Sequence, residues 1–151
     1  MYGYVLGDPV GFVDPDGLIN RRAGHGHNRS YPSQGSKSRA IDLANESKKD
    51  AENSGLPGLG NGLADAYRHC LWSCRMTYEL GSLDAWLYGT GHEVWDNELT
   101  PYSESKMDLR NNCTGRELGD NKSPFNCKSK CFKALKDGKL VTSPLVGGVT
   151  Y

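Results

Sequence analysis

Residues 63–80, LADAYRHCLWSCRMTYEL, hold the pattern that decides the fold of this chain. Apolar side chains recur in this stretch at the 3.6-residue period of one helical face, at Leu63, Ala66, Tyr67, Cys70, Leu71, Cys74 and Tyr78. Gly81 follows, and a glycine just after a periodic stretch is a common helix end. We therefore predict an amphipathic helix over residues 63–80.

Helical patterns also flank this stretch. An apolar stripe among Lys and Glu residues predicts a first helix over about residues 38–53, which the glycine-rich stretch 55–62 ends. Ser82 can cap a third helix over about 83–97. Two glycines interrupt that helix, so we expect a kink or break near residues 88–91.

Two more helices are predicted toward the end of the chain. Pro101 suits the first turn of a helix over about 101–118, closed by Gly119. A Ser-Pro pair opens the next, over about 124–136, which Gly138 closes. The predicted fold class is all-α, a compact bundle of about five helices with possible inter-helix disulfides.

The composition limits the possible functions. The chain has 151 residues, enough for one domain with tails, and its 18 Lys and Arg residues equal its 18 Asp and Glu residues. A dedicated nucleic-acid binder usually has a basic excess, so this balance counts against one. No apolar run approaches the roughly 20 residues of a membrane span, and no signal peptide is recognisable, so we expect other machinery to deliver the protein.

Four of the five cysteines form two pairs, Cys70 with Cys74 and Cys127 with Cys131. Each pair is spaced i, i+4, so both sulfurs face one side of a helix. Four cysteines allow three pairings, and helix geometry favours Cys70–Cys131 with Cys74–Cys127, leaving Cys113 over. Buried free thiols and a four-cysteine zinc site are the alternatives, although zinc ligands usually have C-x2-C spacing. Disulfides would indicate an oxidising compartment, such as the periplasm of a target cell.

Residues able to do chemistry fall into three polar clusters. In the first, Asp65 and His69 lie one helical turn apart, the arrangement in which a carboxylate orients an imidazole base. The second is His92 with Glu93, after a turn broken by glycine. The third is a stripe on the helix after residue 101, formed by Asp108, Asn111, Asn112 and Arg116.

Each cluster also has an ordinary structural explanation. An Asp-x3-His pair is more often a surface ion pair than a catalytic dyad, and an Asp–Asn–Arg stripe is more often a solvated face or a buried network. A small core that holds all three clusters would suffer heavy desolvation unless they satisfied one another. We therefore expect the three helices to converge on one polar pocket of hydrolase type, with Gly115 allowing close approach of another helix or a ligand.

The head segment, residues 2–18, reads YGYVLGDPVGFVDPDGL. A strand, a turn and a second strand would give a similar pattern, but every special position resembles the junction motif of Rhs/YD-repeat polymorphic toxins. The resemblance implies a short extended remnant of the Rhs shell at 1–18 and a cut after Leu18. The polar residues that follow are rich in Gly and Ser, which predicts a flexible arm at 19–37. The helical toxin domain would then cover 38–151. The resemblance also implies two protein partners, the Rhs shell of the parent protein and a cognate immunity protein.

A second resemblance covers about residues 61–119. The pattern D-A-Y-R-H-x-x-W, then G-H-E, then M-D-L-x-N-N-x-x-G-R is similar to small helical bacterial domains found in polymorphic-toxin and phage cargo. These are related to the prokaryotic Wnt-like domains, which implies a lipid-directed function. A looser likeness to secreted phospholipases does not extend to their adjacent His-Asp pair or their calcium loop, so neither is carried over.

The leading hypothesis is an antibacterial toxin that hydrolyses membrane phospholipids in the periplasm or at the membrane of a target cell. His69, oriented by Asp65, would activate water, while His92, Glu93 and Asp108 complete the catalytic set. The residues expected to hold the phosphate head group are Arg68, Asn111, Asn112 and Arg116.

Two alternatives remain. A metal-dependent nuclease toxin would place a divalent metal ion among His69, His92, Glu93 and Asp108. Neutral net charge and paired cysteines both count against nucleic acid as the partner. The other alternative is a non-enzymatic, membrane-perturbing helical toxin.

Overall fold

The computed structural model describes residues 34–95, 102–120 and 126–144, without the side chains of residues 34, 92–95, 102 and 103. The described chain forms five α-helices, α2 Gln34–Glu52, α3 Leu63–Leu80, α4 Ser82–Trp95, α5 Tyr102–Asp120 and α6 Cys127–Lys136. No strand occurs in this part of the chain. The predicted all-α class is confirmed. The predicted extended segment 1–18 and most of the predicted arm, residues 19–33, lie outside the described residues.

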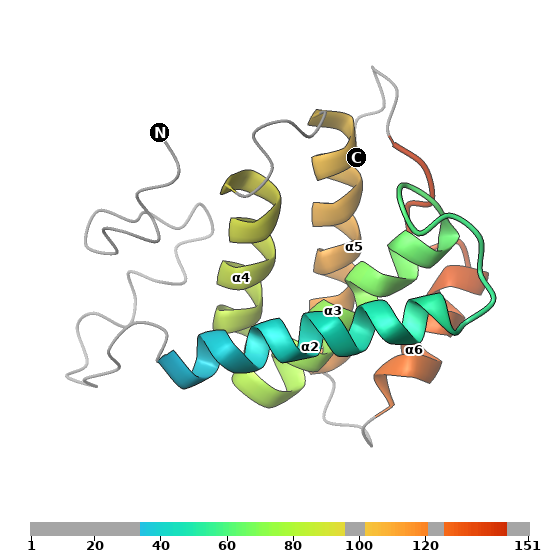
Figure 1. Ribbon diagram of the computed structural model, residues 1–151. Helices are drawn as coiled ribbons and strands as arrows, with labels where there is room; N and C mark the ends of the chain where they lie inside the picture. The colour runs from blue at the N-terminus through green and yellow to red at the C-terminus, as the bar shows by residue number, and fades with distance from the viewer. Residues whose placement is uncertain (1–33, 96–101, 121–125, 145–151) are drawn as a thin grey trace.

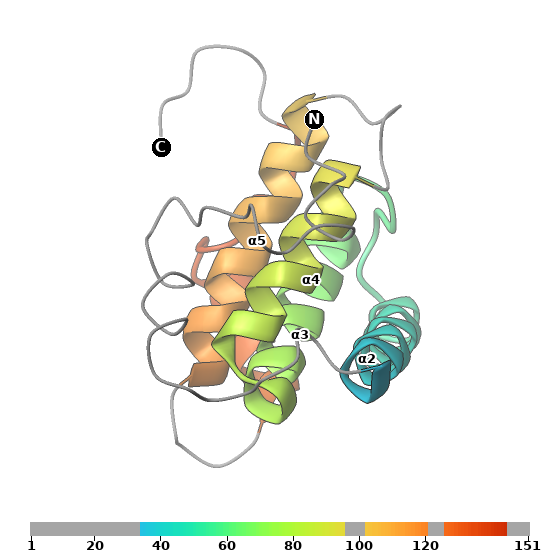
Figure 2. The same ribbon diagram turned by 90° about the vertical axis from the view of Figure 1, so that its left-hand side faces the viewer.

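Helix α3 is the centre of the bundle and contacts each of the other four helices (Figure 1). In Figure 2, α2 lies to one side and α5 to the other, with α3 and α4 between them. Residues 64–67 and 69–77 of α3 are buried, so this helix is covered on nearly all faces. The predicted bounds of α3 are confirmed, and the Gly81 N–H donates to the Thr77 carbonyl at its end.

Helices α3 and α5 pack with their backbones almost in contact. A Cβ atom added at Gly115 would lie 2.4 Å from the carbonyl oxygen of Cys70, and one added at Gly119 would lie 2.4 Å from that of Cys74. These two glycines sit one turn apart and remove the side chains that would hold the helices apart. The expected close approach at Gly115 is confirmed. The prediction that Gly119 ends the helix is wrong, because α5 continues to Asp120.

Helix α4 shows a similar use of glycine. It runs from Ser82 to Trp95 as one helix, so the predicted break near residues 88–91 is wrong. A Cβ atom on Gly89 would lie 3.4 Å from the amide nitrogen of Asn112, so the glycine serves packing against α5 instead of bending α4. Ser82 is the first helical residue and not the cap, since the carbonyl of Gly81 accepts the first α4 bond, from Ala85 N–H.

Helix α2 begins earlier than predicted, at Gln34, so residues 34–37 belong to the helix and not to the flexible arm. Contacts with α4 account for this extension. The Ser36 hydroxyl donates to Asp84 Oδ2 over 2.7 Å, and the Tyr88 hydroxyl donates to Ser36 Oγ over 3.3 Å. Tertiary hydrogen bonds thus outweigh the low helix propensity of the Gly and Ser residues in this turn.

Helix α6 begins at Cys127, later than the predicted start at 124. The side chain of Asn126 provides the N-cap, since its Oδ1 accepts from Ser129 N–H over 3.0 Å. Gly138, with a positive φ of 70°, closes the helix as predicted. Its N–H donates to the Leu135 carbonyl.

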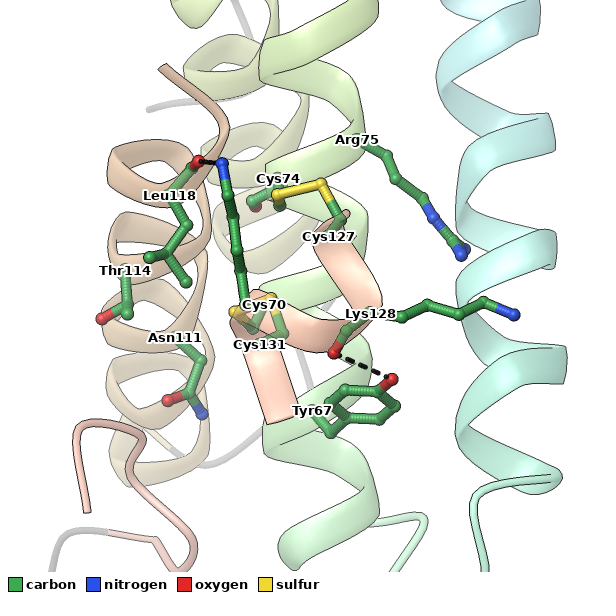
Figure 3. Close-up of a disulfide and its surroundings, with 12 residues drawn as sticks. Tyr67, Cys70, Cys74, Arg75, Asn111, Thr114, Leu118, Cys127, Lys128 and Cys131 are labelled. Atoms are coloured by element: carbon green, nitrogen blue, oxygen red, sulfur yellow. Dashed lines mark hydrogen bonds between the residues drawn. A yellow bond between two sulfur atoms is a disulfide. The ribbon is translucent and has the colours of Figure 1, made fainter. Parts of the chain in front are cut away.

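Two disulfides link α6 to α3, Cys70–Cys131 and Cys74–Cys127, with Cα atoms 5.8 and 5.9 Å apart. The predicted pairing is confirmed, and the alternatives of buried free thiols and a zinc site are wrong for these four residues. Figure 3 shows the two bridges side by side along α3. In the chain-entropy model each bridge, which closes a loop of more than 50 residues, contributes about 4 kcal/mol. Cys113 is a free cysteine.

Candidate functional site

A buried polar cluster lies where α3 faces α5. Helix α3 places Asp65 and His69 one turn apart, and α5 places Asp108 and Asn112 one turn apart. All four residues are buried. Because Gly115 lets the two helices approach closely, the two polar pairs meet across the helix–helix contact.

The ring nitrogen Nε2 of His69 is the meeting point of this cluster. Asp108 Oδ1 lies 3.3 Å from it and Asp65 Oδ1 lies 3.6 Å from it. Nη2 of Arg68 lies 3.0 Å from the same nitrogen and 2.5 Å from Asp65 Oδ1. The other carboxylate oxygen of Asp65 accepts from Asn61 N–H over 2.7 Å, which fixes its orientation at the start of α3.

The hydrogen bonds assign the tautomer of His69. Asn112 Nδ2 lies 3.5 Å from the Gly89 carbonyl, so its Oδ1 is turned toward Nδ1 of His69, 3.2 Å away. A carbonyl oxygen only accepts, so Nδ1 carries the proton. A guanidinium only donates, so the contact from Arg68 requires a lone pair on Nε2. Both contacts agree on a neutral imidazole whose lone pair faces the carboxylates.

A groove of about 430 Å³ borders this cluster between α2, α3 and α4, and both Arg68 and His69 line it. Its apolar lining comes from Ala40, Ile41, Ala44, Trp72, Leu87 and Tyr88. Its cationic lining comes from Lys37, Lys48 and Arg68. The indole of Trp72 is held in place by donating to the Ala40 carbonyl over 2.9 Å. The groove therefore combines an apolar wall with positive charge beside the imidazole.

Three residues of the cluster carry the side-chain types that commonly bind a metal ion. One ligand atom each from Asp65, His69 and Asp108 lies within 4.8 Å of the other two. Two carboxylates and an imidazole suit a divalent cation. The same three groups also suit general acid–base chemistry, because the carboxylates would stabilise a protonated imidazole.

The predicted site residues divide into three groups. The structure brings together Asp65, Arg68, His69, Asp108 and Asn112. His92 and Glu93 lie on α4 next to Gly91, which lines the groove, but their side chains lie outside the described residues. The proposal that they act with His69 stays a prediction.

The amide of Asn111 is used away from this meeting point, and the predicted substrate-binding role of Arg116 stays a prediction. The amide group of Asn111 bonds the Val141 backbone, accepting from its N–H over 2.8 Å and donating to its carbonyl over 2.9 Å. Asn111 therefore holds the backbone at Val141 against α5, and its predicted substrate-binding role stays a prediction. Arg116 lies one turn beyond Asn112 and is partly buried.

The groove wall formed by α2 was not predicted. Its lining residues Lys37, Ile41, Ala44 and Lys48 recur at three- and four-residue spacing. This spacing places apolar and basic residues on one face of the helix. It is the feature of the sequence from which the groove wall could have been predicted.

The fold and the site define a small all-α domain, cross-linked by two disulfides, with a carboxylate–imidazole–carboxylate centre beside an amphiphilic groove. The chain belongs to a family described as a domain of unknown function (DUF6973), whose model matches residues 25–139. The family match thus starts within the arm predicted at 19–37. No solved structure was found to match the chain. Among the described residues, no helix is both long and apolar enough to span a membrane.

Proposed function

We propose that this domain is the toxin part of an Rhs-type protein and that it hydrolyses ester bonds of membrane phospholipids. One observation supports this most. The lone pair of His69 Nε2 lies beside Asp65 and Asp108 at a groove that joins an apolar wall to cationic side chains. An amphiphile with an anionic head group has the chemistry that complements such a groove.

The groove fits part of a phospholipid. Its volume falls within the range of about 300–1,000 Å³ typical of ligand sites. An acyl chain would pack against Ile41, Leu87 and Trp72, while Lys48 and Arg68 would face the phosphate. Arg68 is suited to this, because its side chain is 32% exposed although its Nη2 reaches the buried cluster. Guanidinium groups bind phosphate through paired hydrogen bonds.

Hydrolysis needs a water molecule that loses a proton as it attacks the ester. The water oxygen bonds to the acyl carbon or the phosphorus, the ester bond to the leaving oxygen breaks, and that oxygen takes up a proton. His69 Nε2 can activate the water in two ways, by accepting its proton or by holding a divalent ion to which the water binds. In both cases Asp65 and Asp108 stabilise the positive charge at the centre.

The cellular setting is part of the proposal. Disulfides form and persist in oxidising compartments, which favours the periplasm or outer face of the target membrane as the place of action. A producing cell would need a cognate immunity protein against such a toxin. Expression in bacteria with and without a periplasmic signal peptide tests the setting. We expect killing only with the signal peptide, and equal killing without it would overturn the periplasmic assignment.

The activity is tested by incubating the oxidised domain with vesicles of mixed bacterial phospholipids, followed by lipid mass spectrometry. We expect lyso-lipid, diacylglycerol or phosphatidic acid to accumulate, and His69→Gln to abolish the product. Asp42→Asn, which removes an exposed carboxylate on α2, is the control and should retain activity. Unchanged lipids with the folded wild-type domain would reject the proposal. Full toxicity of His69→Gln at wild-type expression would instead favour a non-enzymatic toxin.

A metal-dependent nuclease is the second candidate, and the grouping of Asp65, His69 and Asp108 is the observation that favours it. The largely apolar wall of the groove and the balanced net charge count against a polynucleotide substrate. Plasmid DNA and RNA incubated with the domain and Mg²⁺, Mn²⁺ or Zn²⁺ decide this. Degradation that depends on His69 would replace the lipid proposal, and intact nucleic acid would exclude the nuclease.

A further inference from the structure

We infer that Asp65, His69 and Asp108 bind a divalent ion of the zinc type, and that the guanidinium of Arg68 takes the place of this ion in its absence. The inference deepens the proposed function by naming how the centre activates water. The activation of water by the ion rests on the proposed function. The binding of the ion does not, because it depends only on the three side chains.

The spacing of the ligand atoms is the first argument. Zinc binds nitrogen and oxygen ligands at about 2.0–2.2 Å in a tetrahedral arrangement, which places two ligand atoms about 3.3–3.6 Å apart. Nε2 of His69 lies 3.3 Å from Asp108 Oδ1 and 3.6 Å from Asp65 Oδ1. All three ligand atoms lie within 4.8 Å of one another. Both distances from the imidazole nitrogen therefore already match those between the ligands of a tetrahedral ion.

The surrounding hydrogen bonds orient the ligands in the way metal sites require. A metal-binding histidine usually donates its other ring N–H to an acceptor, which fixes the lone pair on the ligating nitrogen. Here Nδ1–H of His69 donates to Asn112 Oδ1, and Asn112 is itself held by Gly89. Asn61 N–H occupies Asp65 Oδ2 and leaves Oδ1 facing the imidazole.

Arg68 is the second, independent argument. A lone pair on Nε2 beside carboxylate oxygens is repelled unless a positive group lies among them. Nη2 of Arg68 is such a group, 2.5 Å from Asp65 Oδ1 and 3.0 Å from His69 Nε2. It thus contacts two of the three proposed ligand atoms. Because the Arg68 side chain is partly exposed and lines the groove, an entering ion can displace it toward the groove.

The ligand types select the ion. Calcium and magnesium prefer oxygen ligands throughout, whereas an imidazole with carboxylates suits zinc and its neighbours. Three protein ligands leave a fourth position, which in catalytic zinc sites holds a water whose pKa falls to about 7. The displaced guanidinium of Arg68 would then be available to a phosphate in the groove. Metal binding and substrate binding would share this one residue.

The site is tested on the full chain after oxidation and treatment with chelator. The chain is titrated with Zn²⁺, Mn²⁺ or Ca²⁺ in a calorimeter, and elemental analysis then counts the bound ions. We expect one Zn²⁺ per chain, and binding of Ca²⁺ weaker by more than about tenfold. Asp108→Asn should weaken Zn²⁺ binding by more than about tenfold, and Asn112→Ala by about 10–100-fold. Asp42→Asn, as the control, should leave it unchanged.

Arg68→Met gives the sharpest result, because it removes the competing cation but none of the ligands. We expect Zn²⁺ to bind this variant more tightly than the wild type, with circular dichroism confirming the fold. No stoichiometric binding, or weaker binding to Arg68→Met, would overturn the site. Zinc binding without lipid hydrolysis would overturn the proposed function and keep the site. Hydrolysis that persists in chelator without bound metal would keep the proposed function and overturn the role of the ion in activating water.

Discussion

The ring N–H of His69 on α3 donates to the side-chain oxygen of Asn112 on α5, 3.2 Å away, and both residues are buried. This bond joins the two central helices and sets which nitrogen of the imidazole carries the lone pair. The orientation of the lone pair on His69 Nε2 thus depends on a residue from another helix.

Asn112→Ala tests this dependence. The substitution leaves Nδ1–H buried without its acceptor, which costs about 1–3 kcal/mol of stability. It also frees the imidazole to change tautomer, so we expect lipid hydrolysis to fall by more than the loss of folded protein explains. Urea unfolding and hydrolysis rates on the same samples measure both effects. Wild-type values for both would contradict the assigned role.

The contact between α3 and α5 predicts a large effect for Gly115→Ala. The added Cβ would lie 2.4 Å from the Cys70 carbonyl oxygen, so the helices must separate. Overpacking of this kind costs about 1–3 kcal/mol. Gly60→Ala is the matched control, because a Cβ there meets nothing within 4 Å. Equal unfolding midpoints for the two variants would show that the helices do not pack as described.

The two disulfides should support much of the stability of this small domain. Replacing both Cys74 and Cys127 by Ser removes one bridge, and we expect a loss of about 2–5 kcal/mol. Reducing agent should lower the melting temperature of the wild type further, because it opens both bridges. Thermal unfolding of oxidised and reduced protein measures this. The bridges would have no stabilising role if the two curves coincided.

Acid should weaken the contact between α2 and the rest of the bundle. Burial raises the pKa of Asp50, but hydrogen bonds from Lys128 and Arg75 outweigh burial and hold the pKa of this carboxyl below its usual value. The ionised group therefore stabilises the fold above its unfolded pKa of about 3.9. This stability is lost as the pH falls through the lowered pKa.

Asp50→Asn isolates this effect. At pH 7 the variant should be less stable than the wild type, because Arg75 loses the carboxylate that lies 2.5 Å away. The difference should stay constant down to about pH 5 and shrink below about pH 4, where the carboxyl of the unfolded chain takes up a proton. It should vanish once the pH falls below the lowered pKa of the folded state. Urea unfolding between pH 3 and pH 7 measures it. A difference that grew in acid would reverse the sign of the argument.

Much of the fold was predictable from sequence periodicity. The central helix and the disulfide pairing follow from residues 63–80 and from two i, i+4 cysteine pairs, because helical spacing fixes which side chains share a face. Two of the errors lie at glycines. In the sequence, Gly89 and Gly119 look like positions where a helix ends or breaks. In the structure, each glycine leaves space for a neighbouring helix. Intrinsic helix propensities describe one residue at a time and take no account of contacts between helices.

The candidate site was predictable in part. The sequence predicts that Asp65 lies beside His69 because one helix carries both, and that Asp108 lies beside Asn112 for the same reason. The sequence does not show which neighbour an amide bonds, so the hydrogen bonds of Asn111 to the Val141 backbone were not predictable. The contacts of His69 with Asp108 and Asn112 depend on the meeting of α3 with α5, which no local pattern specifies.

Hydrolysis in water enriched with the heavy oxygen isotope tests the central claim most directly. Vesicles of bacterial phospholipid are incubated with the oxidised domain, and the products are analysed by mass spectrometry. We predict heavy oxygen in the released fatty acid or phosphate group with the wild type, and none with His69→Gln or Asp108→Asn of equal folding. Unlabelled products, or equal labelling by these variants, would contradict water activation at this centre.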